Sequence, residues 1–370
     1  MTNHTVQNPP SIATFLKNIF ELKKKPLDTD QEVHYVLGNE SADLDSISCA
    51  IGRAYLLQNR KNNKNIYLPI INIPREDLAL RKDAKQLIKI LQISPETLLF
   101  EEDLPQAHYN SSLRIDLVDH NALTKRQKYL EPFVSSIVDH HVDEEITYPL
   151  LLVKDKLLAT VGSAATLVSY EMMDESEFIW TPDLAALMLA PILVDTSNLK
   201  DKAKTTLKDK EVAAYLQTIA GDLLDLKTAT ELQKAKVDMS GFTIPMILKK
   251  DLKYFQEASL VYSISSIPAN AAVDWVNAID FRQELAQFVH KQDLDLGMIL
   301  TTNEEERHFI IYTQNAERLS QLQEHMQYIK YADSLELIEK DQENNFLIYK
   351  APKWMSRKIL QPCLQIEKLM

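Results

Sequence analysis

The sequence predicts an α/β protein of two domains, with an N-terminal parallel sheet that carries helices on both faces and a smaller C-terminal α/β domain. Three observations lead to this prediction. The chain has 370 residues, which is more than one ordinary hydrophobic core accommodates. Short apolar runs alternate with amphipathic stretches, as is typical of parallel strands linked by helices. A polar, helix-prone stretch from Lys200 to Lys236 then precedes a second series of strand-like runs.

Each element of the N-terminal domain is predicted from its apolar pattern. The strand-like runs are short and apolar, and they cover Val33 to Leu37, Ile66 to Ile73, Leu113 to Val118 and Ser136 to Val138. The helical stretches repeat apolar residues every three or four positions, and they cover Ile12 to Leu22, Asp45 to Leu57, Leu78 to Leu91, Ser163 to Met173 and Asp183 to Leu193. This alternation favours a parallel sheet covered on both faces.

We interpret the stretch from Lys200 to Lys236 as a helical connection, and we place the two domains at residues 1–225 and 226–370. The strands expected after it are Val261 to Ile264, Leu296 to Leu300, Phe309 to Tyr312 and Phe346 to Tyr349. Two helices are expected among them, at Asp274 to Phe288 and Arg318 to Tyr328. The second domain is therefore the smaller one.

Composition and charge exclude several classes of protein. A net charge of −12 argues against non-specific binding of nucleic acid, which requires a basic surface. The longest apolar stretches, such as Leu184 to Val194, are far shorter than a bilayer span, so no membrane association is expected. The N-terminus lacks a secretory pattern, and only Cys49 and Cys363 occur, so we expect a cytoplasmic protein. With six glycines and no phosphate-binding glycine motif, a Rossmann or P-loop site is not expected.

Four polar clusters stand near the predicted ends of strands or helices in the first domain. They are Gly38 to Ser46, which contains Asp43 and Asp45, then Asp116 to Asn121, Asp139 to His141, and Leu193 to Thr196 with Asp195. Ligands of an open parallel sheet bind at the carboxyl ends of its strands. The first three clusters follow strand-like runs directly, whereas the fourth follows a helical run.

Carboxylates and imidazoles gathered at one place suit divalent metals such as Mg²⁺ and Mn²⁺. Without a cation, several aspartates at one point would repel one another. Taken singly, each cluster has a simpler explanation. Asp43 and Asp45 could cap a helix, and the segment Asp119-His120-Asn121 could form a turn. Their order along one domain favours a metal site.

These clusters resemble those of the DHH phosphoesterase superfamily, which is named for the triplet seen here as Asp139-His140-His141. Within it, the chain is similar to the branch that contains family II inorganic pyrophosphatases, fungal exopolyphosphatases and Prune proteins. The stretches Gly38 to Ser46 and Ile73 to Arg81 resemble the exopolyphosphatase and Prune form. The glycine-rich motif of the branch with RecJ-type nucleases is missing, which counts against a nuclease.

The resemblance implies two divalent ions, of Mg²⁺, Mn²⁺ or Co²⁺. It makes Asp43 a ligand of one ion and Asp45 a ligand of the other, with Asp119 bridging both. It makes His140 and Asp195 further ligands of the second ion.

The resemblance also places Asn39 where pyrophosphatases have a histidine ligand, and an amide oxygen there favours Mg²⁺. It places His141 against the substrate phosphate. His140, His141 and Asp119 are therefore the expected catalytic residues. Asp139 and His120 are expected to orient the metal ligands by bonding to them without binding the metal themselves.

The second domain is similar to that of the same branch. Asp251-Leu252-Lys253 with Phe255, and Ser356-Arg357-Lys358, resemble its two basic motifs. The resemblance implies that Lys253, Arg357 and Lys358 bind substrate phosphates, in an active-site cleft between the two domains. Arg75, Arg81 and Lys82 are weaker candidates for the same role, with a solvated helix face as the alternative.

The expected function is that of a metal-dependent exopolyphosphatase, in which metal-activated water hydrolyses the terminal phosphoanhydride of inorganic polyphosphate and releases orthophosphate. Three alternatives stay open: an inorganic pyrophosphatase or short-chain polyphosphatase, a Prune-like cyclic-nucleotide phosphodiesterase, and a scaffold protein with weak or no catalysis. The sequence leaves chain-length preference, the physiological metal, regulation and oligomeric state open, a monomer included.

Overall fold

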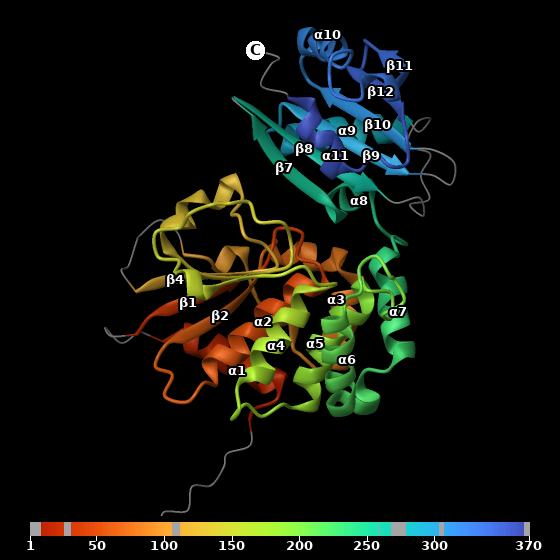
Figure 1. The fold of residues 1–370 in the computed structure, drawn as a ribbon. Helices are drawn as coiled ribbons and strands as arrows, with labels where there is room; N and C mark the ends of the chain where they lie inside the picture. The colour runs from red at the N-terminus through yellow and green to blue at the C-terminus, as the bar shows by residue number, and fades with distance from the viewer. Residues whose placement is uncertain are drawn as a thin grey trace, which may run out of the picture. The chain divides into compact units, whose positions relative to one another are not determined.

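A computed structural model describes residues 9–25, 31–105, 112–257, 259–267, 279–302 and 307–365. The chain divides into two compact units, Met1–Lys236 and Val237–Met370, drawn from red to green and from green to blue in Figure 1. Among the described residues, each unit contains one sheet of six strands. The predicted α/β class, with a smaller second domain, is confirmed. The predicted cleft between the domains stays a prediction.

The sheet of unit 1 is parallel throughout, with the strand order β3-β2-β1-β4-β5-β6. Its strands are β1 (Val33–Leu37), β2 (Ile66–Ile71), β3 (Leu99–Phe100), β4 (Leu113–Val118), β5 (Val134–Asp139) and β6 (Lys156–Leu158). The chain runs outward from β1 in one direction and then returns to place β4 on the other side of β1. The carboxyl ends of β1 and β4 therefore flank the point where the strand order reverses, which is where ligands of such sheets bind.

The helices of unit 1 are α1 (Ile12–Lys23), α2 (Leu44–Gln58), α3 (Lys82–Ile90), α4 (Ala164–Asp174), α5 (Pro182–Asp195), α6 (Leu207–Ala220) and α7 (Leu226–Val237). In the part of unit 1 that the structure describes, 3-10 segments accompany them at Arg75–Leu80, Pro95–Thr97, Glu101–Asp103, Lys125–Phe133, Val153–Asp155 and Gly221–Leu223. The crossover from β1 to β2 contains α2, and the crossover from β4 to β5 contains Lys125–Phe133. Because the two crossovers turn in opposite directions, right-handed connections place them on opposite faces of the sheet.

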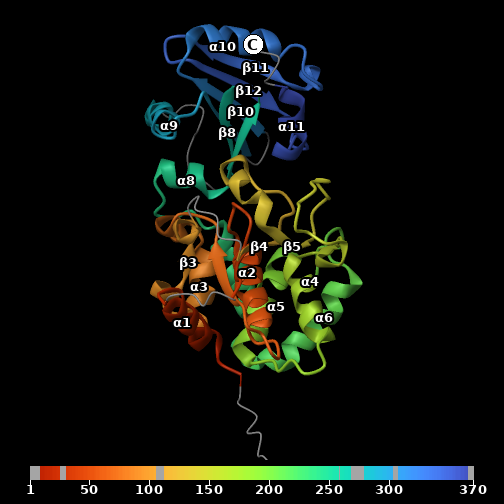
Figure 2. The same cartoon turned by 90° about the vertical axis from the view of Figure 1, so that its left-hand side faces the viewer.

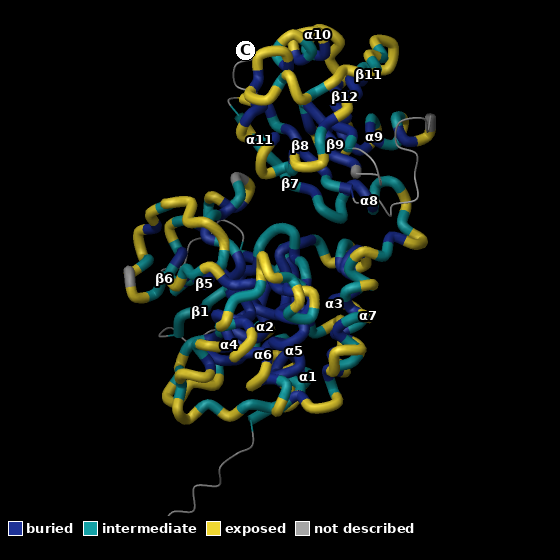
Figure 3. Tube along the Cα trace, turned by 45° about the vertical axis from the view of Figure 1, so that its right-hand side comes forward, coloured by how far each residue is buried: buried dark blue, intermediate teal, exposed yellow. Residues whose placement is uncertain are grey.

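Helix α2 is enclosed on all sides. Every residue from Leu44 to Leu57 is buried, because α2 packs on β1 and β2 and is covered by α4 and α5. Figure 2 shows α2 and α5 in the middle of the unit, and Figure 3 shows both as largely buried. The N-terminus of α2, which carries Asp43 and Asp45, is thereby fixed beside the strand ends.

The four strands predicted for this domain are confirmed, with β5 extending from Val134 to Asp139. The strands β3 and β6 were not predicted, because two- and three-residue edge strands carry little pattern. The predicted helix from Leu78 to Leu91 is divided into a 3-10 segment and α3, because Arg81 between them has a non-helical backbone at φ −104° and ψ 67°.

The predicted domain boundary, between residues 225 and 226, stays a prediction. It lies at the start of α7, whereas the two compact units part after Lys236. The physical reason is that α6 and α7 are more than a connection, since their apolar residues are buried in the core of unit 1. Val212 and Leu216 of α6 and Ala229 and Leu232 of α7 belong to that core.

The sheet of unit 2 is mixed, with the order β11-β12-β10-β9-β8-β7. Its strands are β7 (Leu252–Glu257), β8 (Leu260–Ile267), β9 (Leu296–Thr302), β10 (Arg307–Thr313), β11 (Glu336–Asp341) and β12 (Phe346–Ala351). Only β8 and β9 pair in parallel among these described strands. Phe309 and Ile311 pack into one hydrophobic cluster and Ile310 into another, as alternating side chains on two faces of a strand do.

The helices of unit 2 are α8 (Ile244–Lys250), α9 (Ile279–Lys291), α10 (Ala316–His325) and α11 (Arg357–Leu364), with a 3-10 turn at Ala332–Ser334. The four predicted strands lie within β8, β9, β10 and β12. The predicted helix from Asp274 to Phe288 corresponds to α9 from Ile279 onward, and its first five residues lie outside the described residues. None of the helices described in either unit is both long and apolar enough to span a membrane.

Candidate metal centre

Asn39, which follows β1, joins the ends of the two central strands by bonding to Asp119, which follows β4. The Nδ2 atom of Asn39 donates to Oδ2 of Asp119 at 2.6 Å and to its backbone oxygen at 3.2 Å. Asp119 has a left-handed backbone at φ 62°, which aspartate tolerates better than most residues. The Oδ1 atom of Asn39 accepts from the backbone of Ser41 and Ala42 and from the Ser41 hydroxyl. Asn39 thus orients Asp119, while its role as a metal ligand stays a prediction.

The two aspartates of the first cluster have different partners. Asp43 is the N-cap of α2 and accepts from the backbone N–H of Ser46 at 3.1 Å. Asp45 is buried, and it accepts from the Ser163 hydroxyl at 2.7 Å and from the backbone N–H groups of Ala164 and Ala165 at 2.7 and 3.0 Å. The capping alternative therefore holds for Asp43 at α2. Asp45 instead lies at the N-terminus of α4, where a negative charge is favoured.

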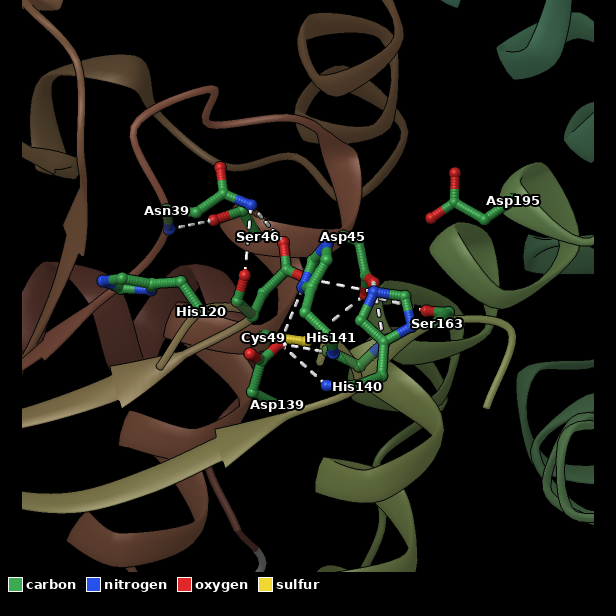
Figure 4. Close-up of polar contacts among 12 residues, drawn as sticks. Asn39, Asp45, Ser46, Cys49, His120, Asp139, His140, His141, Ser163 and Asp195 are labelled. Atoms are coloured by element: carbon green, nitrogen blue, oxygen red, sulfur yellow. Dashed lines mark hydrogen bonds and ion pairs between the residues drawn. The ribbon is translucent and has the colours of Figure 1, made fainter. Parts of the chain in front are cut away.

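His140 lies close to the carboxylates of Asp119 and Asp45, and Figure 4 shows its ring together with Asp45. Its Nε2 atom lies 3.3 Å from Oδ1 of Asp119 and 3.9 Å from Oδ2 of Asp45. Its Nδ1 atom lies 2.9 Å from the backbone oxygen of Val161, which can only accept, so Nδ1 carries a proton. In the neutral ring Nε2 is then the lone-pair nitrogen, as a metal ligand requires.

Asp139 fixes the neighbouring histidine. Its buried Oδ1 accepts from the backbone N–H groups of His140 and His141, and it lies 2.8 Å from Nδ1 of His141. Its Oδ2 accepts from Asn121 at 2.6 Å. The side chain of His141 is 44% exposed, so its Nε2 edge is available to solvent or substrate. These bonds agree with the orienting role expected of Asp139.

His120 lies apart from the rings of His140 and His141 in Figure 4. Its Nδ1 atom lies 2.9 Å from the backbone oxygen of Val118, in the strand that precedes it. The orienting role expected of His120 stays a prediction.

Asp195 stands apart from the other acidic residues in Figure 4, as the last residue of α5. Its Oδ1 atom accepts from Nζ of Lys236 at 2.6 Å, and the same ammonium lies 3.8 Å from Oδ2 of Asp43. Burial opposes the charge on Lys236, but Asp43 and Asp195 outweigh it and raise the pKa of Lys236. Burial also opposes ionisation of Asp43, but Lys236 and the Ser46 N–H outweigh it and lower the pKa of Asp43.

The carboxylates of the site carry more negative charge than the ammonium of Lys236 can balance. Burial and the charge of Asp45 raise the pKa of Asp119 well above its ordinary value. Burial, together with Asp43 and Asp45, raises the pKa of Asp195 to about 7 in spite of Lys236. Burial opposes protonation of His140, but Asp119 and Asp45 raise its pKa to about 10. Protons thus take up charge that a metal ion would neutralise.

The donor atoms fit hard divalent ions. Asp119, His140 and His141 each offer one ligand atom, and the three atoms lie within 4.8 Å of one another. Carboxylate oxygens with an imidazole nitrogen suit Mg²⁺, Mn²⁺ and Co²⁺ rather than soft metals. Together with the excess negative charge, this chemistry supports a metal centre at the ends of β1, β4 and β5.

Several supporting groups were not singled out in the sequence. The segment 161–165 holds His140 through Val161 and Asp45 through Ser163 and the two N–H groups that follow. Asp209 of α6 fixes this segment, because its carboxylate accepts from the N–H of Gly162 at 2.9 Å and from the Thr166 hydroxyl at 2.6 Å. No sequence signal marks such groups, since their partners are distant in the chain.

The basic residues predicted in unit 2 are held to different degrees. Arg357 begins α11, and its guanidinium donates to the backbone oxygens of Asp251 and Ile264 and to the Asp251 carboxylate, at 2.7 to 3.1 Å. Lys253 on β7 is half-buried and Lys358 on α11 is exposed. Arg357 is therefore a fixed cation beside two less restrained lysines.

The weaker basic candidates of unit 1 also have structural partners. Buried Arg81 donates to the backbone oxygen of Ala42 at 3.1 Å, which supports the loop before Asp43. Arg75 donates to the backbone oxygen of Leu98 at 3.0 Å and lies over the ring of Phe100. Lys82 is half-buried at the start of α3. These contacts favour a structural role for both arginines.

Two family models match the chain. The DHH family, N-terminal domain, matches residues 34–192, and the DHHA2 domain matches residues 230–365. The first range contains Asn39, Asp43, Asp45, Asp119 and the triplet from Asp139 to His141 but ends before Asp195, and the second contains the basic residues of unit 2.

The chain is similar to proteins named exopolyphosphatases. It is 34% identical over 245 residues to "Exopolyphosphatase PRUNE1" of Rattus norvegicus, covering 65% of this chain but only 53% of that relative. It is 31% identical over 327 residues to "Putative exopolyphosphatase" of Schizosaccharomyces pombe, covering 82% of this chain and 83% of the relative. The chain thus spans about half the length of the first relative and most of the second.

The fold is similar to the crystal structure of a putative family II inorganic pyrophosphatase from Methanococcus jannaschii. The TM-score is 0.59 at 23% sequence identity, and the match covers 90% of this chain and 99% of that one. At this identity the likeness concerns the fold alone.

Proposed function

Because the chain belongs to the DHH family, in the branch in which a DHHA2 domain follows, we propose that it is a metal-dependent exopolyphosphatase. It would hydrolyse the terminal phosphoanhydride of inorganic polyphosphate and release orthophosphate. The names of the two exopolyphosphatase relatives support the substrate class. The observation that carries the proposal is the approach of His140 Nε2 to Asp119 and Asp45, at 3.3 and 3.9 Å, with Nδ1 held by Val161.

Two divalent ions, of Mg²⁺, Mn²⁺ or Co²⁺, complete the proposed site. The residues that would hold them are Asp43, Asp45, Asp119, His140 and Asp195. Ions bound there would acidify a water molecule and neutralise charge on the phosphoryl oxygens. Asn39 would contribute by fixing Asp119, and the N–H groups at the start of α4 would fix Asp45.

The remaining residues would bind and orient the substrate. Asp139 accepts from Nδ1 of His141, so Nε2 of this half-exposed ring would donate to a phosphate oxygen when the ring carries both protons. Lys253, Arg357 and Lys358 would bind further phosphates of the chain. Arg357 is preorganised for this by Asp251, and a planar guanidinium suits a phosphate better than a free lysine does.

A substrate panel tests the proposal. The purified chain is stripped with EDTA, reloaded with Mg²⁺, Mn²⁺ or Co²⁺, and assayed for phosphate release from long polyphosphate, tripolyphosphate and pyrophosphate, and for hydrolysis of cyclic AMP. We expect metal-dependent release from polyphosphate to be the fastest. Faster release from pyrophosphate or tripolyphosphate, or hydrolysis of cyclic AMP alone, would support the corresponding alternative. No hydrolysis of any substrate with any metal would support a scaffold.

A further inference from the structure

The ammonium of Lys236 lies between two proposed ligands of the metal centre, Asp43 of one ion and Asp195 of the other. It is 2.6 Å from Oδ1 of Asp195 and 3.8 Å from Oδ2 of Asp43. The side chain of Lys236 is 33% exposed and that of Asp195 is 18% exposed, so this pair is less screened than a surface pair. Buried Asp83 of α3 also acts electrostatically on Lys236. Lys236 is thus a cation among three carboxylates.

The face of α7 that carries Lys236 also holds the end of α5. Gln233 donates to the backbone oxygen of Leu193 at 2.9 Å, and Asn198 donates to the Thr230 hydroxyl at 3.0 Å. Residues 230, 233 and 236 are three apart, so they lie along one side of the helix. The helix α7 therefore bonds to residues that precede and follow Asp195 in the chain, namely Leu193 and Asn198.

The turn that follows Asp195 is strained. Ser197, Asn198 and Leu199 have φ values of 53°, 56° and 62°, which are left-handed conformations that asparagine tolerates but that are unfavourable for serine and above all for leucine. Such a turn persists only where its surroundings hold it. The bonds from α7 are among those that hold it, so the position of Asp195 depends on α7.

We propose that Lys236 is a built-in competitor of the metal: its ammonium neutralises Asp195 and Asp43 in the metal-free protein, and it is displaced from them when the ion binds. This inference rests on the proposed metal centre. An ammonium that neutralises a carboxylate makes it a weaker ligand for an ion, and two cations at this spacing repel each other. Because Lys236 is the last residue of unit 1, metal loading would also loosen the chain where unit 2 begins.

The test compares Mn²⁺ binding by calorimetry at pH 8 in the wild type, Lys236→Met and Lys234→Met. Lys234 is exposed on the same helix, so its substitution removes the same charge away from the site. We expect Lys236→Met to bind Mn²⁺ about tenfold more tightly than the wild type, while Lys234→Met binds as the wild type does. Lys236→Met should also have the lower Tm in EDTA, with a larger rise in Tm on adding Mn²⁺.

Hydrogen exchange of the wild type provides a second measurement that needs no variant. Amides at the end of α7, residues 233–237, should exchange faster with Mn²⁺ than in EDTA. Equal or weaker Mn²⁺ affinity in Lys236→Met than in Lys234→Met, or unchanged or slower exchange at the end of α7, would overturn the inference. Failure of the wild type to bind Mn²⁺ at all would instead refute the proposed function on which it rests.

Discussion

Two aspartates on opposite sides of the candidate metal centre are in contrasting environments. Asp139, the last residue of β5, accepts from two backbone N–H groups, from Asn121 and from the ring of His141, and these bonds outweigh its burial and lower its pKa to about 2. Asp195, the last residue of α5, has the ammonium of Lys236 as its partner, and burial raises its pKa to about 7.

The difference follows from the secondary structure that precedes each aspartate. After a parallel strand, the turning chain presents N–H groups to the carboxylate. A helix presents its unpaired carbonyl oxygens at its C-terminus, where negative charge is disfavoured. A carboxylate at the end of β5 is therefore stable by itself, whereas one at the end of α5 requires a cation, either the ammonium of Lys236 or a metal ion.

The largest expected loss of activity follows substitution of Asp119, which contacts both Asn39 and His140. Substitution of a residue that only orients a metal ligand typically lowers activity by roughly 10- to 100-fold. Asp119→Asn should reduce metal-dependent phosphate release by more than this. Asparagine tolerates the left-handed backbone at this position, so the loss would reflect the missing charge rather than unfolding. Phosphate release and circular dichroism measure both. Near-normal activity in a folded variant would refute the bridging role.

Substitution on the β5 side should have the next largest effect. Asp139→Asn removes the carboxylate charge and turns one of its two acceptor oxygens into a donor, which weakens the bonds that fix His141, and we expect activity to fall by about 10- to 100-fold. The matched control is Asp143→Asn, because Asp143 lies in the same loop and pairs with Lys156 on the surface. Steady-state assays of both variants measure the effect. An equal loss in both variants would mean that the loop as a whole, rather than the bond to His141, matters.

Arg357→Ala separates substrate binding from metal binding. We expect Mn²⁺ affinity to be unchanged, and the rate at low polyphosphate concentration to fall by about tenfold, as the loss of one charge-assisted contact implies. Calorimetry and initial rates measure the two effects. The Tm must be compared as well, because Arg357 also bonds to the backbone of Asp251 and Ile264. An unchanged rate would return Arg357 to a structural role.

The pH dependence of stability in EDTA is the smallest expected effect, and it has opposite signs at the two aspartates. Asp139 has its pKa lowered from 3.8 to about 2, so its contribution is present above pH 3.8 and is lost as the pH falls toward 2. Asp195 has its pKa raised from 3.8 to about 7, so the folded protein loses stability as the pH rises through that interval.

Thermal unfolding of the wild type and of Asp139→Asn and Asp195→Asn between pH 2 and 8 measures both contributions. The Asp139 contribution is on the order of 2 kcal/mol. Asp195→Asn should flatten the decline toward neutral pH, and added Mn²⁺ should flatten it in the wild type, because the ion binds the ionised carboxylate. The same decline in Asp195→Asn as in the wild type would assign it to another buried carboxyl group of the site, such as Asp119, whose pKa is also raised.

The sequence by itself determined the α/β class, the four long strands of unit 1 and the positions of the acidic clusters. The physical reason is local. Apolar runs of strand length followed by polar residues identify strand ends, and the carboxyl ends of parallel strands lie along one edge. The Asp139-His140-His141 triplet could be found because its residues are adjacent in the chain.

Only the tertiary structure decided which partner each charged group has. Lys236 lies in the last turn of α7, a lysine-rich helix whose sequence resembles a solvated connection, and its bond to Asp195 spans 41 positions in the sequence. The assignment of α7 to unit 1, the bond of Asp45 to the start of α4 and the orientation of the Asn39 amide likewise depend on packing between distant segments. The local sequence pattern predicts where a strand or helix ends. The partner of a buried charge depends on tertiary packing, because it comes from a segment that is distant in the sequence.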